Sequence, residues 1–283
     1  MSTKEEALKK AMELKEEVRV RGDDLQQMVE EAVRKAFGET LKEEMPPRRS
    51  FAVEGEYPPD RRTVEEIPDR EKGHTLQWYK GINSIAVNIK LKMGEGKKGT
   101  ILFSSSVSGE GTTTICSSVA RALSKVCTGN VLLIDCNAQN PEIHKIFNTA
   151  AVPGLTDVLY GKVNWEDAVR KSSIKNFFIL PFGQSVPESL ALFGSESMEG
   201  LLNTLKTTFD YICLDVPPIL GSGEAEIIVQ KVETSVLIVK AQATRREVVM
   251  RAAERMVQYK DFMGAVINQQ EFIIPQFLYK RLK

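Results

Sequence analysis

Residues 100–114 read Thr-Ile-Leu-Phe-Ser-Ser-Ser-Val-Ser-Gly-Glu-Gly-Thr-Thr-Thr. An apolar run of strand length leads into a glycine-containing loop, and the pattern over 112–126 is that of a helix. Backbone N–H groups at the start of such a helix, together with the positive end of its dipole, form a cradle for an anion. The stretch therefore predicts a phosphate-binding loop, in which Gly109 and Gly111 allow the backbone to approach the phosphates.

The predicted loop departs twice from the usual pattern, G-x-x-x-x-G-K-[ST]. Ser106 occupies the first glycine position and Thr112 the lysine position. The second change matters more, because lysine brings a positive charge to the β- and γ-phosphates and threonine brings only a neutral hydroxyl. On the motif alone, a structural helix cap is the competing interpretation. The residues predicted to bind the nucleotide are Ser108, Gly109, Glu110, Gly111, Thr112, Thr113 and Thr114, with Thr113 at the Mg²⁺ position.

Strand and helix patterns alternate through the rest of the chain. Several strand patterns are almost continuous runs of Val, Ile and Leu, as expected for strands that are buried on both faces. We therefore predict an α/β fold with a doubly wound, mostly parallel sheet, in which ligands bind beyond the carboxyl ends of the strands. The strand patterns cover 100–104, 131–134, 177–180, 211–214, 235–239 and 265–267. The helix patterns cover 112–126, 197–208, 224–231 and 245–260.

Two aspartates stand at the ends of predicted strands. Asp135 follows 131–134, and Asp215 follows 211–214. Taken singly, each is more often a cap or turn residue, but an aspartate beside a phosphate loop can hold Mg²⁺ or its water shell. With the loop and both aspartates in order, the sequence predicts a fold of the P-loop NTPase type. Asp135 and Asp215 are the predicted catalytic residues and, with Thr113, the predicted metal ligands.

The charged residues cancel in total, with 38 Lys and Arg against 38 Asp and Glu, but they are unevenly placed. Residues 1–75 hold 15 basic and 19 acidic side chains, whereas 76–283 hold 23 and 19. Helix-forming residues with near-heptad apolar spacing occupy much of 1–45, and five prolines without periodicity lie in 46–75. We therefore expect a charged helical N-terminal extension, a linker and a folded domain over 76–283. The extension is either a docking helix or a solvated one.

Composition disfavours several classes of protein. The zero net charge argues against a nucleic-acid-binding protein. No apolar run approaches the ~18–20 residues that span a membrane, and the N-terminus lacks a secretory pattern, so we expect a cytoplasmic protein. A zinc site is not expected, because the four cysteines form no C-x-x-C pair. The cysteines are expected to be buried and reduced: Cys116, Cys127, Cys136 and Cys213.

From about residue 76 onward, the chain resembles the bacterial tyrosine kinases of capsule and exopolysaccharide synthesis. The matching motifs occur in order at 104–113, 131–137, 154–161, 180–183 and 209–218, followed by Asn268 at a strand end. The resemblance implies ATP or ADP and Mg²⁺ as cofactors, with Asn268 among the nucleotide-binding residues. It implies as partner a membrane polysaccharide co-polymerase or an active kinase paralogue, and it leaves a homo-oligomer open. Such a partner would recruit the cytoplasmic protein to the inner face of the membrane.

Several positions depart from the family pattern. Thr112 replaces the loop lysine, and Asn137 replaces the second aspartate of the strand-end motif. Only Tyr279 is left of the C-terminal tyrosine cluster that accepts phosphate in the family. The helical motif for oligomerisation, with Glu, Arg and Arg at three-residue spacing, is represented by Gln77, Lys80 and Asn83.

These losses predict a pseudo-kinase with weak or no nucleotide hydrolysis, acting as a regulator or scaffold. The alternative is an active tyrosine kinase or ATPase that uses a Lys or Arg from a neighbouring subunit. A positioning ATPase of the partitioning type is disfavoured, because Val107 stands where those proteins carry a second lysine. The amphipathic stretch 77–91, with Trp78 and Tyr79, is expected to pack on the sheet, with a subunit contact as the alternative.

Overall fold

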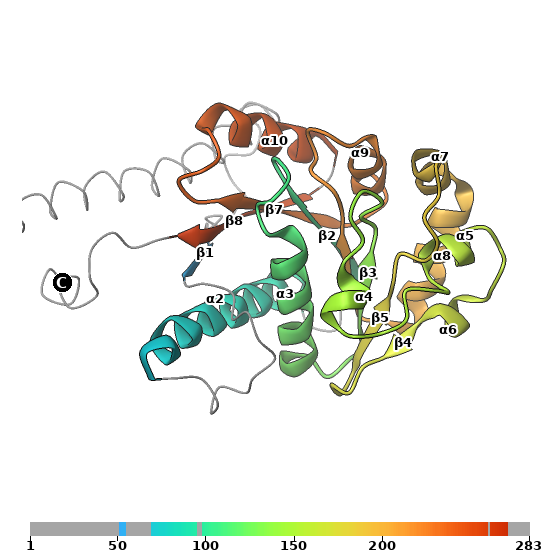
Figure 1. Cartoon of the computed structure of the whole chain (residues 1–283), viewed down its shortest axis with the longest axis horizontal. Coiled ribbons are helices and arrows are strands. Elements are labelled where there is room, and N and C mark those ends of the chain that lie inside the picture. Colours follow the sequence, from blue (N-terminus) through green and yellow to red (C-terminus); the bar gives the residue numbers. More distant parts are fainter. Residues whose placement is uncertain (1–50, 55–68, 95–97, 260, 271–283) are drawn as a thin grey trace, which may run out of the picture.

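The computed structural model describes residues 51–54, 69–94, 98–259 and 261–270. In these ranges, eight strands form one sheet in the order β1-β8-β7-β2-β6-β3-β5-β4 (Figure 1). All neighbouring strands are parallel except β4 and β5. The strands are β1 Phe51–Glu54, β2 Gly99–Ser105, β3 Val131–Asp135, β4 Arg170–Lys171, β5 Phe177–Leu180, β6 Tyr211–Asp215, β7 Thr234–Lys240 and β8 Asp261–Gln270. The helices are α2 Asp69–Met93, α3 Thr112–Val126, α4 Ile143–Ile146, α5 Leu155–Leu159, α6 Trp165–Ala168, α7 Ser189–Gly194, α8 Glu196–Thr208, α9 Gly223–Val229 and α10 Arg246–Tyr259.

The predicted fold, an α/β architecture with a doubly wound, mostly parallel sheet, is confirmed. Each strand and helix pattern found in the sequence coincides with an element of the structure to within a few residues. Alternate residues of a central strand are buried on opposite faces of the sheet. Val131 and Leu133 of β3 join an apolar cluster with α2 and α3, whereas Leu132 and Ile134 join a second cluster with α8, α9 and α10. Burial on both faces explains the continuous apolar runs.

The stretch predicted to be a linker, 46–75, contains two elements of the fold. Phe51–Glu54 forms β1 at the edge of the sheet, and α2 begins at Asp69, so the expected domain start at residue 76 lies inside a helix. A four-residue strand is too short to show a recognisable pattern. Its partner, moreover, lies far along the chain, since Phe51 pairs with Val266 of β8. The predicted N-terminal extension, 1–45, lies outside the described residues.

The amphipathic stretch 77–91 packs against the sheet, as predicted. Trp78, Ile82 and Ile85 are buried at three- and four-residue spacing along α2. They belong to the same apolar cluster as side chains of α3, β2 and β8. Helix α2 is therefore part of the folded domain and covers one face of the sheet beside α3.

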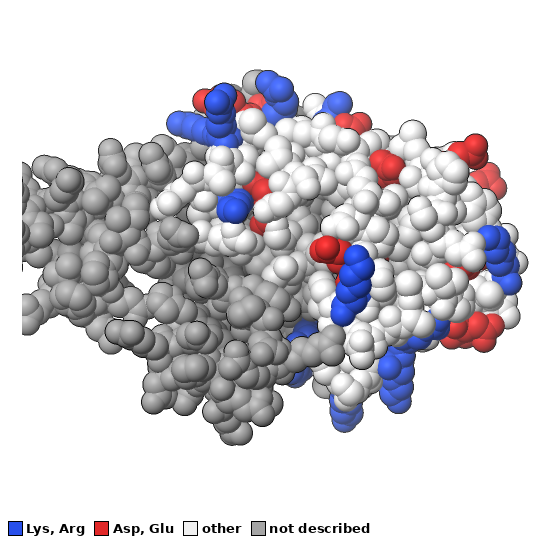
Figure 2. Space-filling view, viewed as in Figure 1, with Lys and Arg blue, Asp and Glu red and all other residues white. Residues whose placement is uncertain are grey.

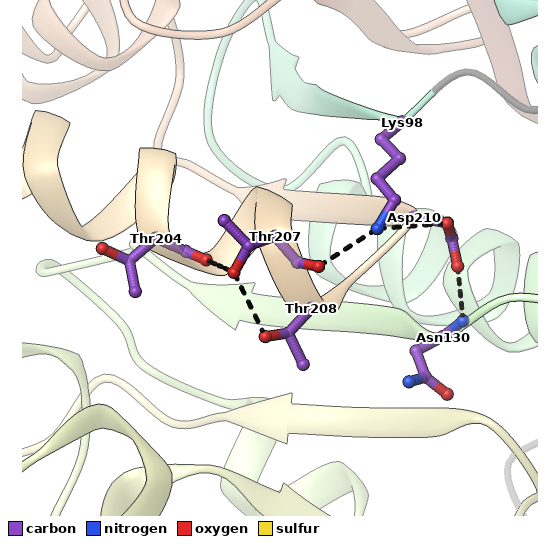
Figure 3. A network of polar contacts seen from close by, with 6 residues as sticks. All are labelled: Lys98, Asn130, Thr204, Thr207, Thr208 and Asp210. Carbon is purple, nitrogen blue, oxygen red and sulfur yellow. Dashed lines mark hydrogen bonds and ion pairs between the residues drawn. The ribbon is translucent and has the colours of Figure 1, made fainter.

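Polar contacts tie together the strands at the amino end of the sheet (Figure 3). The Asp210 carboxylate accepts a hydrogen bond from the Asn130 backbone N–H at 3.0 Å and lies 3.6 Å from the Lys98 ammonium. Lys98 also donates to the carbonyl of Thr207 at the end of α8, at 3.1 Å. These contacts link the residues that precede β2, β3 and β6 to one another. They therefore help to fix the register of these three strands, whose opposite ends form the site described below.

The four cysteines are free and buried, as predicted. None of the helices within the described ranges combines the length and the apolar character needed to cross a bilayer.

Candidate nucleotide-binding site

The loop between β2 and α3 has the conformation that its glycines predict. Gly109 and Gly111 have φ angles of +83° and +89°, a region that side chains with a Cβ rarely adopt. Gly111 also directly precedes α3, and a Cβ atom on it would lie 2.2 Å from Nδ2 of Asn268. Position 111 therefore requires glycine for two separate reasons.

The Glu110 side chain is turned into the protein. Its carboxylate accepts hydrogen bonds from the backbone N–H groups of Ser106 at 2.6 Å and Val107 at 2.9 Å. It also accepts from the backbone N–H of Lys240 at 3.0 Å and from the Thr244 hydroxyl. The residue is only 1% exposed. The structure gives the Glu110 carboxylate a positioning role that links the loop to the end of β7, and nucleotide binding at Glu110 stays a prediction.

Asn268 lies next to the loop, as the family pattern implies. Its side-chain amide donates to the backbone carbonyl of Glu110 at 2.8 Å and is buried. The first N–H groups of α3, at Thr112, Thr113 and Thr114, have no partner within the helix because of helix geometry. These three residues are half-buried at the mouth of the loop. The arrangement can receive an anion at the positive end of the helix dipole.

Asp135 and Asp215 lie side by side at the carboxyl ends of β3 and β6, where they are paired in register. Asp135 accepts hydrogen bonds from the backbone N–H groups of Asn137 and Ile143, both at 3.1 Å. Burial still raises the pKa of Asp135 to about 6, although these hydrogen bonds oppose the shift. The strand ends thus bring together the two aspartates that the sequence singled out.

Asp215 has fewer hydrogen bonds to its carboxylate than Asp135 has. It is fully buried, and among the described residues no group donates a hydrogen bond of normal length to either oxygen. Burial first, and then the charge of Asp135, raise the pKa of Asp215 well above its usual range, while the nearby Thr113 hydroxyl lowers it in part. Two buried carboxylates beside a hydroxyl make a donor set that suits Mg²⁺. Thr113, Asp135 and Asp215 therefore fit the predicted metal site.

Asn137 has a local structural role. Its side-chain oxygen accepts a hydrogen bond from the Asn140 backbone N–H at 3.1 Å, which closes the turn after β3. A carboxylate at this position could act as a base and bind a metal ion with its charge, whereas the neutral amide of Asn137 cannot act as a base and offers a metal ion only an uncharged oxygen.

The loop itself holds no cation that could replace the missing lysine. Glu110 is the one charged residue between Ser104 and Thr114. No described Lys or Arg forms an ion pair with Glu110, Asp135 or Asp215. The contacts of Thr244 and of the Lys240 backbone with the loop were missed from the sequence. The one sequence feature that could have indicated these contacts is Glu110, a lone glutamate in an otherwise uncharged loop. A glutamate that is buried needs hydrogen-bond partners.

Comparison with known proteins identifies the family. A family model described as an AAA domain matches residues 98–248. Tyrosine-protein kinase CpsD of Streptococcus agalactiae is 30% identical over 207 residues, which cover 72% of this chain and 89% of CpsD. Tyrosine-protein kinase YwqD of Bacillus subtilis is 29% identical over 186 residues, which cover 65% of this chain and 78% of YwqD.

The same fold occurs in the kinase domain of Escherichia coli tyrosine kinase ETK. The two structures superpose with a TM-score of 0.65 at 20% sequence identity, covering 70% of this chain and 80% of that domain. The phosphate loop, the paired strand-end aspartates, the CpsD match and the shared fold all lead to one assignment: the chain belongs to the bacterial tyrosine kinase family of P-loop ATPases.

Proposed function

We propose that this chain is a kinase-like component of a system that makes and exports exopolysaccharide or capsule, and that it acts as a regulator or scaffold with weak or no phosphotransfer. The proposal combines the family assignment with the departures at the phosphate loop. In this role the protein would dock on a membrane polysaccharide co-polymerase or on an active kinase paralogue. Such a partner would hold the chain at the inner face of the membrane.

One observation carries the proposal: Thr112 stands where the family has its loop lysine, and no other cation lies between Ser104 and Thr114. Phosphoryl transfer depends on neutralising the charge that develops on the β- and γ-phosphates. Loss of one preorganised donor of this kind costs on the order of 10²–10³ in rate. The buried carboxylates of Asp135 and Asp215 add negative charge to the same region, so ATP or ADP would depend on Mg²⁺ to bind and would bind weakly.

A second candidate is an active tyrosine kinase or ATPase with an unusual loop. The uncompensated carboxylate of Asp215, close to the Thr113 hydroxyl, favours it, because these groups fit a bound Mg²⁺ and the cost of burying them would be relieved by the metal. In this case a neighbouring subunit would supply the Lys or Arg that the loop lacks.

Titration calorimetry with ATP·Mg²⁺ and a phosphotyrosine blot of the full chain separate the two candidates. We expect weak nucleotide binding, no phosphotyrosine, and an affinity gain of about tenfold or more in Thr112→Lys. Asn203→Lys is the matched control, because Asn203 is exposed on α8, outside the predicted site, and receives the same charge. Robust ATP-dependent autophosphorylation of the unaltered chain would refute the scaffold proposal. Equal gains from the two lysine substitutions would refute the role given to position 112.

A further inference from the structure

A second cavity lies apart from the phosphate loop. It is a groove of about 930 Å³ between α2, α3, α4 and β4. None of the predicted nucleotide or metal ligands lines it. Its volume lies within the range of about 300–1,000 Å³ that is typical of ligand sites.

The groove is strongly basic. Glu142 is its one acidic lining residue, against the basic residues Arg121, Lys125, Lys145, Arg170 and Lys171. Arg121, Lys125 and Lys171 are exposed, and within the described part of the chain none of their three side chains has a hydrogen-bond or ion-pair partner. Figure 2 shows Lys and Arg side chains along the lower edge of the molecule, around the region that α3 and β4 occupy in Figure 1.

Two of these cations face the groove from one side of α3. Arg121 and Lys125 are four residues apart, so they project from the same helix face, where like charges repel each other. Lys171 on β4 adds a third positive charge from a different element. An anionic ligand would turn this repulsion into attraction, because each cation could donate charge-assisted hydrogen bonds to it.

The groove is also partly apolar. Tyr79 and Ile82 of α2, Phe147 after α4 and Ile174 before β5 line it together with the cations. Phe147 and Tyr79 are only half-buried in the structure, so each keeps part of its ring surface accessible. A ligand that fits this lining combines a compact anionic group with a flat apolar body.

We propose that the groove binds phosphotyrosine within a peptide segment. The phosphate brings a charge of about −1.5 to −2 and three acceptor oxygens, which suit Arg121, Lys125 and Lys171. The tyrosine ring would lie against the apolar lining beside Tyr79. A tyrosine kinase of this family makes that group, so the partner would be a phosphorylated tail of an active kinase. The inference rests on the scaffold part of the proposed function and does not depend on whether this chain has lost phosphotransfer.

Binding of a synthetic phosphotyrosine peptide to the full chain, measured by fluorescence polarisation, tests the inference. We expect the phosphorylated peptide to bind at least about tenfold more tightly than its unphosphorylated twin. Arg121→Ala combined with Lys125→Ala should weaken binding by about tenfold or more, and Lys171→Ala alone should weaken it as well. Arg251→Ala is the matched control, since Arg251 is exposed on α10, which packs on the opposite face of the sheet.

Three results would overturn the inference. Equal affinity for the two peptides would mean that the groove does not recognise the phosphate. Displacement of the peptide by ATP·Mg²⁺, with no effect of the Arg121 and Lys125 substitutions, would assign binding to the phosphate loop. A change of oligomeric state in the double variant, with peptide affinity intact, would identify the groove as a contact between copies of the chain. None of these three results changes the outcome that we expect from the ATP·Mg²⁺ titrations, which test the proposed function separately.

Discussion

Replacing Asp215 by asparagine should change how the stability of the metal-free protein depends on pH. The folded state buries this carboxyl group, no described group donates a hydrogen bond of normal length to it, and its pKa is raised well above 3.8. The folded chain therefore binds the proton more tightly than the unfolded chain does. The cost of ionising the buried carboxyl group is absent at pH values below its pKa in the unfolded chain. This cost lowers the stability of the folded state increasingly as pH rises towards the pKa of Asp215 in the folded chain. The asparagine variant has no ionising group at position 215, so its stability relative to that of the wild type should increase as pH rises.

The neighbouring carboxylate shows the same effect. Burial raises the pKa of Asp135 to about 6, even though two backbone N–H groups stabilise its charge. Asp215 is also buried and lacks such backbone hydrogen bonds, so burial, followed by the charge of Asp135, raises its pKa in the same direction. One titrating carboxyl group changes the unfolding free energy by up to about 1.4 kcal/mol per pH unit between its unfolded and folded pKa values, so the difference between Asp215→Asn and wild type should grow at up to that rate as pH rises above about 4.

Urea unfolding at half-unit pH intervals in EDTA measures this difference, and effects common to both proteins cancel. Asp167→Asn serves as the control, because Asp167 is exposed and its substitution should leave stability almost constant at every pH. Added Mg²⁺ should recover stability in the wild type more than in Asp215→Asn. A difference between Asp215→Asn and wild type that stays flat from pH 4 to pH 7 would refute the view of Asp215 as a buried, uncompensated carboxylate.

Three further substitutions test the loop and the domain boundary. Gly111→Ala forces a Cβ atom to within 2.2 Å of the Asn268 amide at a positive φ, so it should lower the unfolding free energy by at least about 2 kcal/mol; Asn268→Ala in the same chain should restore part of this. Glu110→Gln keeps the shape but weakens several hydrogen bonds to a charged acceptor, so it should cost about 1–3 kcal/mol and speed amide hydrogen exchange at Ser106. Ile85→Ala should cost about 2–5 kcal/mol if α2 is a full part of the domain, and a cost near zero in urea unfolding would show that it is not.

The sequence predicts the elements whose pattern is local. Strands β2, β3 and β6 are buried on both faces, and their apolar runs are visible without any knowledge of their neighbours. The strand-end positions of Asp135 and Asp215 follow from the same runs, because parallel strands bring their carboxyl ends to one edge. The site was therefore predictable to the extent that it depends on strand ends and on the loop motif.

Elements that depend on distant partners were not predictable. Strand β1 has four residues and is defined by its pairing with β8 rather than by its own pattern. The contacts of Glu110 with Lys240 and Thr244 join segments about 130 residues apart, and no local pattern encodes them. The basic groove likewise collects side chains from α2, α3, α4 and β4, whose proximity is a property of the folded domain alone.

The Glu110 contacts also explain how the chain can lose its loop lysine and still keep the loop. In the structure, backbone N–H groups of Ser106 and Val107 are satisfied by the Glu110 carboxylate, and Asn268 holds the Glu110 carbonyl. The loop is thus held by protein groups and needs neither a lysine nor a phosphate to keep its shape. Substitution at position 112 therefore removes charge from the nucleotide site without removing the fold. Surfaces that depend on the fold, including the basic groove, would persist even with weak chemistry at the loop, as the proposed function requires.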